Sequence, residues 1–180
     1  MTPKEQKAEL RKILLAKRDD LALNYKALLD NAVVSKLEEL IEQRQPKVIH
    51  TYLPFGSEID IYSLIQSLLD RKITVICPKS LPKKELQNLV LHSLSELEEG
   101  RFGTKHPANS SEYTGEIDMY IVPGIGFDNR SYRLGYGSGY YDKYFSSHPS
   151  GYKVGICYPF QVINNFPEES HDVKLDHVIY

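Results

Sequence analysis

The first quarter of the chain has the apolar spacing of two amphipathic helices. Residues 2–5, TPKE, offer an N-cap residue, a proline at the first helical position and a glutamate for a capping box. This first helix is predicted to run to about Lys17. Apolar residues then recur at intervals of three and four over 24–43, which predicts a second helix that ends before Pro46. The chain therefore begins with two helices before any strand.

Beyond residue 46, short apolar runs alternate with helical spacing. Strands are predicted over 47–53, 73–77, 87–93, 117–122, 152–157 and 173–180. Helices are predicted over 60–71 and 139–146, residues 94–100 are expected to form a short turn or helix, and residues 100–115 a mobile loop. Because strand, helix and strand in succession favour parallel pairing, we predict one three-layer α/β/α domain over residues 1–180. Its mostly parallel central sheet is expected to have five to seven strands.

Composition narrows the possible partners. The formal net charge is −2, which gives no electrostatic basis for nucleic acid or an anionic membrane as the main partner. No apolar run approaches the ~18 residues of a membrane span, and the charged N-terminus has no signal-peptide core. We therefore expect a cytoplasmic protein whose main partner is neither nucleic acid nor a membrane. We also expect it to be a monomer or a weak oligomer.

The two cysteines, Cys77 and Cys157, each end an apolar, β-branched run. A single optional pair does not make a disulfide framework, so both are expected to be buried free thiols. We further expect them to lie in adjacent strands of a protein in a reducing compartment.

Residues 123–142, PGIGFDNRSYRLGYGSGYYD, carry the clearest functional signal. Every second residue of the stretch GYGSG at 135–139 lacks a Cβ, so successive backbone N–H groups can point toward one phosphate. Asp142 follows where a helix is predicted to begin, close enough to hold a divalent cation against that phosphate. The stretch is neither a Walker A motif nor the dinucleotide fingerprint GxGxxG. A tight strand-to-helix connection is the alternative, but Arg133 and Asp142 on either side favour a phosphate site at the strand's carboxyl end.

The motif PGIGFD…RLGYGSGYYDKYF resembles the signature of the 5-formyltetrahydrofolate cyclo-ligases, also called 5,10-methenyltetrahydrofolate synthetases. The resemblance extends to Lys7-x-x-x-Arg11, Glu58, Pro78 and the segment HDVKLD at 171–176. It implies an ATP- and magnesium-dependent ligase of folate one-carbon metabolism. Such an enzyme converts 5-formyltetrahydrofolate to 5,10-methenyltetrahydrofolate and releases ADP and phosphate. The chemistry suits this glycine loop, because a formamide oxygen must become a phosphate ester before it can leave.

The resemblance also implies roles for individual residues. ATP is expected to contact Lys7, Arg11, Arg133, Leu134, Gly135, Tyr136, Gly137, Ser138, Gly139, Tyr140 and Tyr141. Folate is expected to contact Phe55, Glu58, Tyr136, Gly137, Ser138, Gly139 and Tyr140. Arg133 and Tyr140 are the candidate catalytic residues. Asp142 and Asp176 are the candidate magnesium ligands.

Without the resemblance, several of these residues have structural explanations. Lys7 and Arg11 are typical of a solvated helix face. Glu58 is explained equally well as an acid in the first turn of a helix, where it interacts with the helix dipole. Asp142 and Asp176 are then acids at a helix start and a strand end.

Other residues of the central motif have separate expectations. Asp128 is expected to accept hydrogen bonds from the N–H groups of a turn. Tyr140 and Tyr141 cannot share one role, because a helix sets consecutive side chains ~100° apart. We expect one of them to face a ligand and the other to pack inward.

The chain departs from its relatives within the glycine loop. Tyr136 and Ser138 stand where many relatives have lysine or arginine at one or both positions. The positive charge is therefore expected from outside the loop. The candidates are Lys7, Arg11, Arg133 and Lys143. Lys105 and His106 lie in the expected loop at 100–115. There they either contact the glutamate tail of a folate or are surface residues without a role in binding.

Two other functions remain open on the sequence. One is an ATP-independent sugar-phosphate isomerase or acyl-CoA transferase, because related α/β sheets with glycine loops also bind single phosphates. The other is a non-catalytic module that binds folate or nucleotide, which the uncharged loop positions suggest.

Overall fold

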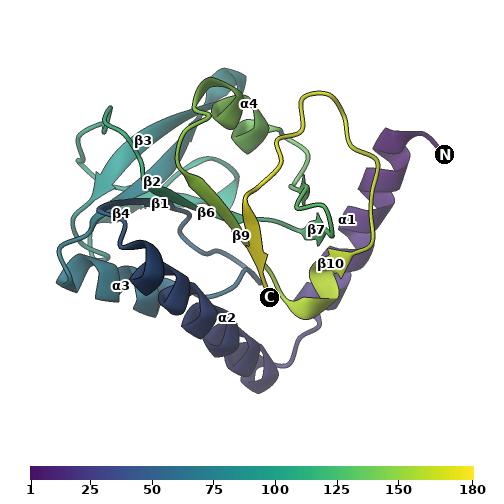
Figure 1. The fold of residues 1–180 in the computed structure, drawn as a ribbon, viewed down its shortest axis with the longest axis horizontal. Coiled ribbons are helices and arrows are strands. Elements are labelled where there is room, and N and C mark those ends of the chain that lie inside the picture. The colour runs from purple at the N-terminus through teal and green to yellow at the C-terminus, as the bar shows by residue number, and fades with distance from the viewer.

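A computed structural model describes residues 1–180, and a six-stranded sheet lies at its centre (Figure 1). In order across the sheet, the strands are β11 (His177–Ile179), β9 (Tyr152–Ile156), β6 (Met119–Pro123), β1 (Val48–Thr51), β2 (Thr74–Leu81) and β3 (Glu85–Leu91). Neighbouring strands are parallel except β2 and β3, which form an antiparallel hairpin. The predicted α/β fold with a mostly parallel central sheet is confirmed.

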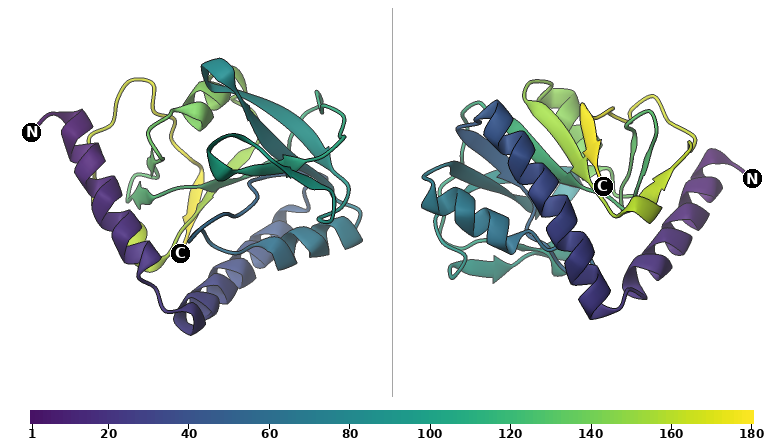
Figure 2. Two further views of the ribbon diagram at one scale, coloured as in Figure 1. Left: turned by 180° about the vertical axis from the view of Figure 1, so that it is seen from behind. Right: turned by 60° about the horizontal axis from the view of Figure 1, so that its bottom comes forward.

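Helices cover both faces of this sheet (Figures 1 and 2). They are α2 (Leu23–Arg44), α3 (Tyr62–Asp70) and α4 (Tyr140–Ser147). Along β6, Met119 and Ile121 join the core formed with α2 and α3, whereas Tyr120 and Val122 join the core formed with α4. The three layers follow from this alternation. The structure contains no helix long and apolar enough to cross a bilayer.

The first helix, α1 (Pro3–Asp19), packs at the side of the molecule, away from the central sheet (Figure 2). It begins with the predicted capping box. The backbone N–H of Thr2 donates to Glu5 Oε2 at 2.7 Å, and the Thr2 hydroxyl accepts from the Glu5 N–H at 3.3 Å. The two predicted helices at the start of the chain are thus confirmed, each extended by one or two residues at its end.

A small second sheet supports α1. It consists of β10 (Val162–Ile163), β7 (Gly126–Asp128) and β8 (Arg133–Leu134), in that order. Leu14 of α1 is buried beside this sheet, and a Cβ on Gly126 would lie 2.7 Å from Leu14 Cδ1. Because Gly126 has no side chain, α1 approaches β7 closely. The three short strands were not predicted, since two or three residues are too few to show a period of two.

Two predictions about the segment after β3 are wrong. The expected turn or helix at 94–100 contains strand β4 (Leu97–Glu99), and the expected loop at 100–115 contains strand β5 (Lys105–Pro107). These strands pair antiparallel around a turn at Arg101–Gly103, where Phe102 has a left-handed φ of 59°. The glycine and proline content that indicated an irregular loop instead marks the two ends of a short hairpin.

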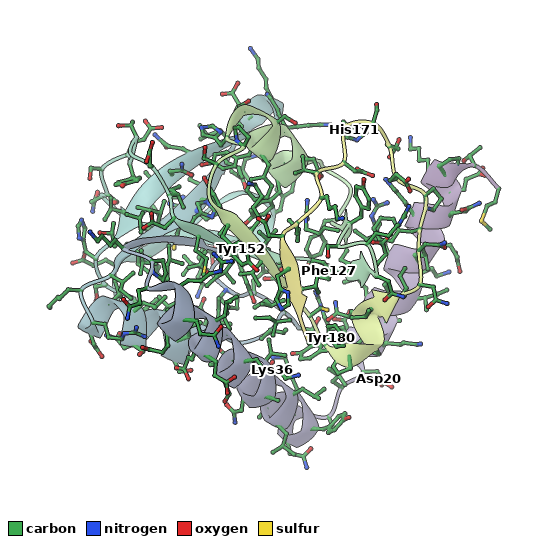
Figure 3. The ribbon with its side chains drawn as sticks, in the orientation of Figure 1. Asp20, Lys36, Phe127, Tyr152, His171 and Tyr180 are labelled. Atoms are coloured by element: carbon green, nitrogen blue, oxygen red, sulfur yellow. The ribbon has the colours of Figure 1, made fainter.

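The last strand is shorter than the predicted range 173–180. The backbone of residues 173–176 hydrogen-bonds to other segments before β11 begins: Leu175 N–H donates to Ser131 O, and Asp176 N–H donates to Lys153 O. This part of the chain therefore forms a loop that crosses the edge of the small sheet. Phe127 points into the interior beneath this region, whereas His171 lies on the outer part of the loop (Figure 3).

Cys77 and Cys157 are buried free thiols, as predicted. They do not lie in adjacent strands, however. Cys77 belongs to β2 and Cys157 follows β9, and β1 and β6 lie between those strands. The apolar runs indicated burial correctly but contained no information on strand order.

An unusual histidine lies inside the sheet. His50 of β1 is completely buried among aromatic rings, with ring centroids of Tyr120 at 5.3 Å and Tyr144 at 5.9 Å. Neither of its ring nitrogens forms a hydrogen bond. Burial without a partner for the charged form lowers the pKa of His50 to about 3.

The His50 environment makes stability depend on pH. The unfolded chain binds a proton at His50 below about pH 6.5, whereas the folded protein does so only near pH 3. Stability from this group is therefore complete above pH 6.5 and decreases as the pH falls, by about 2 kcal/mol at pH 5. We expect His50→Leu to remove this loss. The free energy of unfolding of the variant, relative to that of wild type, should therefore be higher at pH 5 than at pH 8. Urea denaturation at the two pH values measures the difference in free energy of unfolding between variant and wild type. His177→Leu, at an exposed histidine, is the control. An equal difference at both pH values would contradict the prediction.

Candidate active site

A pocket of about 430 Å³ lies at the carboxyl ends of the parallel strands. Pro123 at the end of β6, Leu53 after β1 and Pro78 in β2 form its floor. The glycine loop, α1 and the β2–β3 hairpin contribute its walls. This is the edge where open α/β sheets bind ligands, as the position of the motif predicted.

Nearly all of the predicted site residues line this pocket. They are Lys7, Arg11, Phe55, Glu58, Arg133, Leu134, Gly135, Tyr136, Gly137, Ser138, Gly139, Tyr140, Tyr141 and Asp142. Asp176 alone among the predicted residues does not. The lining residues come from α1, the loop after β1 and the segment from β8 to α4, so the fold brings together what the sequence separates.

The glycine loop has the backbone that its composition predicted. Gly137 and Gly139 have φ values of 98° and 70°, in the left-handed region that side chains disfavour. Gly139 is also the N-cap of α4, so the loop ends at a helix N-terminus, where N–H groups are free to bind an anion.

Two arginines lie against the bare backbone of this loop. The Arg133 guanidinium occupies the space where a Cβ on Gly135 would be. Arg11 Cζ lies 3.4 Å from the Cβ position of Gly137, and Arg11 Nε donates to Gly135 O at 2.8 Å. The absence of side chains thus allows both cations to reach the loop. Arg11 does not belong to a solvated helix face.

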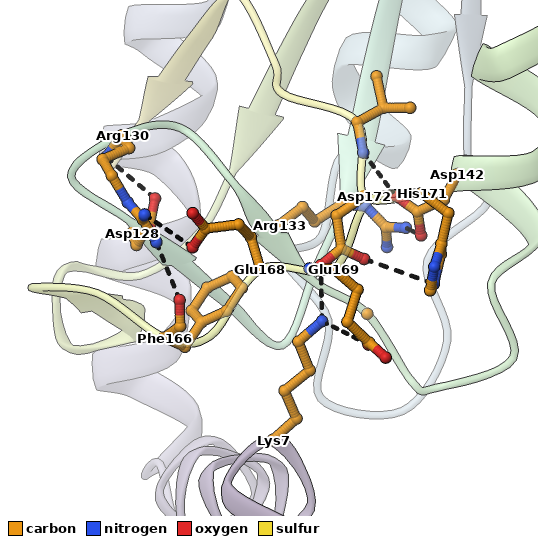
Figure 4. Close-up of polar contacts among 12 residues, drawn as sticks. Lys7, Asp128, Arg130, Arg133, Asp142, Phe166, Glu168, Glu169, His171 and Asp172 are labelled. Carbon is orange, nitrogen blue, oxygen red and sulfur yellow. Dashed lines mark hydrogen bonds and ion pairs between the residues drawn. The ribbon is translucent and has the colours of Figure 1, made fainter. Parts of the chain in front are cut away.

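Lys7 is also not solvated. Its ammonium group donates to Glu169 Oε2 at 2.9 Å and to Asp172 Oδ2 at 2.6 Å, and only 5% of the residue is exposed (Figure 4). Burial by itself would lower the pKa of Lys7, but the bonds to these two carboxylates outweigh it and raise the pKa. Lys7 therefore connects α1 to the loop before β11.

Asp142 stands close to Asp172. Its Oδ2 accepts from Arg133 Nη2 at 3.2 Å, and its Oδ1 accepts from the backbone N–H of Val173 at 3.3 Å (Figure 4). Asp172 is the residue immediately before Val173, and both aspartates line the pocket. Two carboxylates from different segments thus lie beside the glycine loop.

The expected pairing of Asp142 with Asp176 is not present. Asp176 Oδ2 accepts from the backbone N–H of Lys153 at 2.7 Å, where it joins the loop to β9. The segment HDVKLD holds both Asp172 and Asp176, and nothing in its pattern distinguishes the two. The turn before β11, which the sequence did not reveal, decides which aspartate reaches the pocket.

Glu58 is buried rather than placed in a first helical turn, since α3 begins only at Tyr62. Its Oε2 accepts from the backbone N–H of Phe55 at 3.2 Å, and its Oε1 accepts from the Tyr136 hydroxyl at 3.2 Å. The rings of Phe55 and Tyr136 stack at a centroid distance of 6.0 Å. Burial raises the pKa of Glu58 to about 7, although these hydrogen bonds and nearby Arg18 act to lower it.

Arg18 is a functional candidate that the sequence reasoning missed. It is 4% exposed, and its Nη2 donates to the Tyr136 hydroxyl at 2.7 Å, which in turn donates to Glu58. Lys7, Arg11 and Arg18 are spaced by four and seven residues, so they share one face of α1. This spacing is the feature of the sequence that indicates Arg18 as a neighbour of Lys7 and Arg11.

The remaining predictions on the motif can be compared with the contacts. Tyr140 donates its hydroxyl hydrogen to Leu81 O at 2.8 Å, whereas the Tyr141 hydroxyl has no partner and its ring lies 5.1 Å from the Arg133 guanidinium. The two tyrosines thus have different surroundings, although both line the pocket.

Asp128 accepts hydrogen bonds from the backbone N–H groups of Arg130 and Tyr132, both at 3.0 Å, which confirms its structural role. Lys105 lines the pocket. His106, however, is buried in the β4–β5 hairpin, where its Nδ1 lies 3.4 Å from Glu98 Oε1. Only the first of these two basic residues is therefore available to a ligand.

Known proteins resemble this chain over nearly its whole length. A model of the 5-formyltetrahydrofolate cyclo-ligase family matches residues 3–180. The 5-formyltetrahydrofolate cyclo-ligase of Haemophilus influenzae is 32% identical over 176 residues, which cover 94% of this chain and 92% of that protein. The NMR structure of Aquifex aeolicus 5,10-methenyltetrahydrofolate synthetase has a TM-score of 0.83 and 34% identity, and covers 96% of this chain and 88% of its own. The 5,10-methenyltetrahydrofolate synthetase structure from Mycoplasma pneumoniae has a TM-score of 0.79 and 29% identity, with coverages of 96% and 97%.

The raised pKa of Glu58 leads to a prediction about stability. The unfolded carboxyl group loses its proton near pH 4.5 and the folded one near pH 7, so wild type loses stability as the pH rises through this interval. We expect Glu58→Gln to be more stable than wild type at pH 8, by at most about 3 kcal/mol, and to have no such advantage at pH 4.5. Thermal or urea unfolding at both pH values provides the test. A variant less stable than wild type at pH 8 would show that Glu58 is not a destabilising charge.

Proposed function

Because this chain belongs to the 5-formyltetrahydrofolate cyclo-ligase family, we propose that it converts 5-formyltetrahydrofolate to 5,10-methenyltetrahydrofolate, using ATP and magnesium and releasing ADP and phosphate. We further propose that it does so in the cytoplasm. One observation carries the proposal. A single pocket contains a glycine loop with two arginines against its backbone and, beside it, a buried carboxylate flanked by two aromatic rings. The first suits a nucleotide and the second suits a pterin.

The nucleotide phosphates are proposed to bind along the glycine loop. Backbone N–H groups at the start of α4 would donate to phosphate oxygens, and Arg11 and Arg133 would balance their charge. Both guanidinium groups already lie within contact distance of the loop backbone, so little reorganisation is needed. Lys7 would join them once its two carboxylate partners turn to a cation.

The pocket has a donor set that fits magnesium. Asp142 and Asp172 offer hard carboxylate oxygens, and Mg²⁺ is usually held by one or two carboxylates together with substrate phosphates. When bound, the ion would supply positive charge that neutralises the charge on the phosphates. Asp142 lies beside Arg133 and Asp172 beside Lys7, so the two carboxylates would hold the ion among the cations that meet the phosphates.

The folate is proposed to bind with its pterin ring at Glu58. A carboxylate there accepts hydrogen bonds from the N–H groups of the ring, while Phe55 and Tyr136 contact its faces. The hydrogen-bond chain from Arg18 through Tyr136 holds Glu58 in place before the substrate arrives. Since only the ionised form of Glu58 accepts with both oxygens, binding would strengthen as the pH rises through about 7.

The reaction follows from this juxtaposition. The formyl oxygen attacks the γ-phosphorus of ATP, a new oxygen–phosphorus bond forms, and the bond to ADP breaks. The neighbouring amine of the folate then attacks the formyl carbon and releases its proton to solvent. The oxygen leaves as phosphate with its electron pair, which gives the cationic methenyl product. Arg133 would stabilise the charge on the transferred group. Tyr140 remains a candidate catalytic residue, and its hydroxyl donates to Leu81 in this structure.

The direct test follows the absorbance of 5,10-methenyltetrahydrofolate after mixing the protein with 5-formyltetrahydrofolate. We expect product only when ATP and magnesium are both present, with one ADP released for each product formed. Turnover without ATP would contradict the proposal and favour another phosphate-binding enzyme. Binding of both ligands without turnover would favour a non-catalytic module.

The two aspartates in the pocket give a second prediction. Asp142→Asn and Asp172→Asn are each expected to raise, roughly tenfold or more, the magnesium concentration needed for half-maximal nucleotide binding, because each removes a charged ligand. Calorimetric titration of ATP at several magnesium concentrations measures the shift without relying on activity. Asp176→Asn is the matched control from the same HDVKLD segment and is expected to behave as wild type. A shift in this control, and none in Asp172→Asn, would restore Asp176 as the ligand.

A further inference from the structure

Each of the three alternating glycines has a cation next to it, and each cation comes from a different element. Arg133 of β8 lies against Gly135, and Arg11 of α1 lies 3.4 Å from the Cβ position of Gly137. The Cβ position of Gly139 has a single neighbour within 4 Å. This neighbour is Lys84 Nζ at 3.8 Å, from the tip of the β2–β3 hairpin. Lys84 is the one member of this set that the sequence did not suggest.

The hairpin tip is fixed against the start of α4. The Tyr140 hydroxyl donates to Leu81 O at 2.8 Å, and Lys143 Nζ donates to Lys83 O at 2.8 Å. Lys143 Nζ also lies 3.9 Å from Glu85 Oε1. These contacts bracket Lys84 on both sides in sequence, so its backbone is held beside the end of the glycine loop.

Lys84 differs from the three other cations beside the glycine loop because its side chain has no partner. Lys7 is paired with two carboxylates, Arg133 with Asp142, and Arg11 with the Gly135 carbonyl. The Lys84 side chain is exposed and forms neither a hydrogen bond nor an ion pair in the structure. An exposed ammonium group at the phosphate-binding end of a loop is available to an anion without breaking another contact.

The backbone of Lys84 is unfavourable for a lysine. Lys83 and Lys84 have φ values of 60° and 59°, in the left-handed region where glycine, asparagine and aspartate are the common hairpin residues. A lysine at such a position stores strain, which is typical of sites where the side chain has a use. Lys83 shares this conformation, but none of its atoms lies within 4 Å of the Cβ position of Gly139.

We propose that Lys84 is a phosphate-binding residue that contacts the phosphate chain of the nucleotide at the Gly139 end of the loop. It supplies the positive charge that Tyr136 and Ser138 do not provide. The inference rests on the proposed function, because it assumes that a nucleotide lies along the glycine loop. The arrangement distributes one cation to each glycine, so the phosphate chain is contacted along its length.

The test measures binding of the magnesium complex of a non-hydrolysable ATP analogue, by calorimetry, to the full chain. Lys84→Gln is expected to weaken binding about tenfold, which is typical of one charge-assisted contact to a phosphate, and Lys84→Arg to restore most of it. Lys83→Gln is the matched control, because it removes the same charge from the same left-handed turn, and it is expected to bind as wild type. Equal binding by Lys84→Gln and wild type would overturn the proposal, as would equal losses in Lys84→Gln and Lys83→Gln.

A further variant separates binding from folding. Lys84→Gly relieves the left-handed strain, so we expect a melting temperature at or above that of wild type together with the same weakened nucleotide binding. Binding of 5-formyltetrahydrofolate alone is expected to be unchanged in every Lys84 variant. If wild type itself bound no nucleotide, the proposed function would fail. If wild type bound and turned over while Lys84→Gln matched it, only the role of Lys84 would fail.

Discussion

The pocket depends on the close approach of α1 to β7. Gly126 has no side chain at the point where Leu14 packs, and any Cβ there would meet the Leu14 methyl group. This contact places the helix beside the small sheet, away from the central one, and so turns one of its faces toward the glycine loop. Lys7, Arg11 and Arg18 lie along that face. A steric constraint in a small apolar core thus decides where three charged groups act.

Much of the fold could be predicted from the sequence because its signals are local. The capping box of α1, the helical spacing before Pro46 and the alternation of strands and helices depend only on neighbours along the chain. The glycine loop could be predicted for the same reason. Strands of two or three residues could not, since their pairing is determined by distant segments. Strand order, and with it the separation of Cys77 from Cys157, depends on tertiary contacts.

The candidate site likewise has a part that the local sequence predicts and a part that depends on tertiary contacts. The residues of the central motif line the pocket as expected, because one continuous segment carries them. The residues proposed in addition, Arg18, Asp172 and Lys84, lie on a buried helix face, in an irregular turn and at a hairpin tip. Whether a charged residue on such a segment meets the loop or water depends on how the segment docks. Composition, charge and spacing contain no record of that docking, so the sequence does not show that Asp172 lines the pocket and Asp176 does not.

The ion pairs of Lys7 join the first helix to the last loop across separations of 162 and 165 residues. During synthesis, α1 leaves the ribosome long before Glu169 and Asp172 are made. The Lys7 ammonium group must therefore wait for its two partners until the segment that carries them has followed. Completion of this wall of the pocket thus depends on a segment far along the chain. A product truncated before this segment would retain most of the central sheet but would leave Lys7 without either carboxylate.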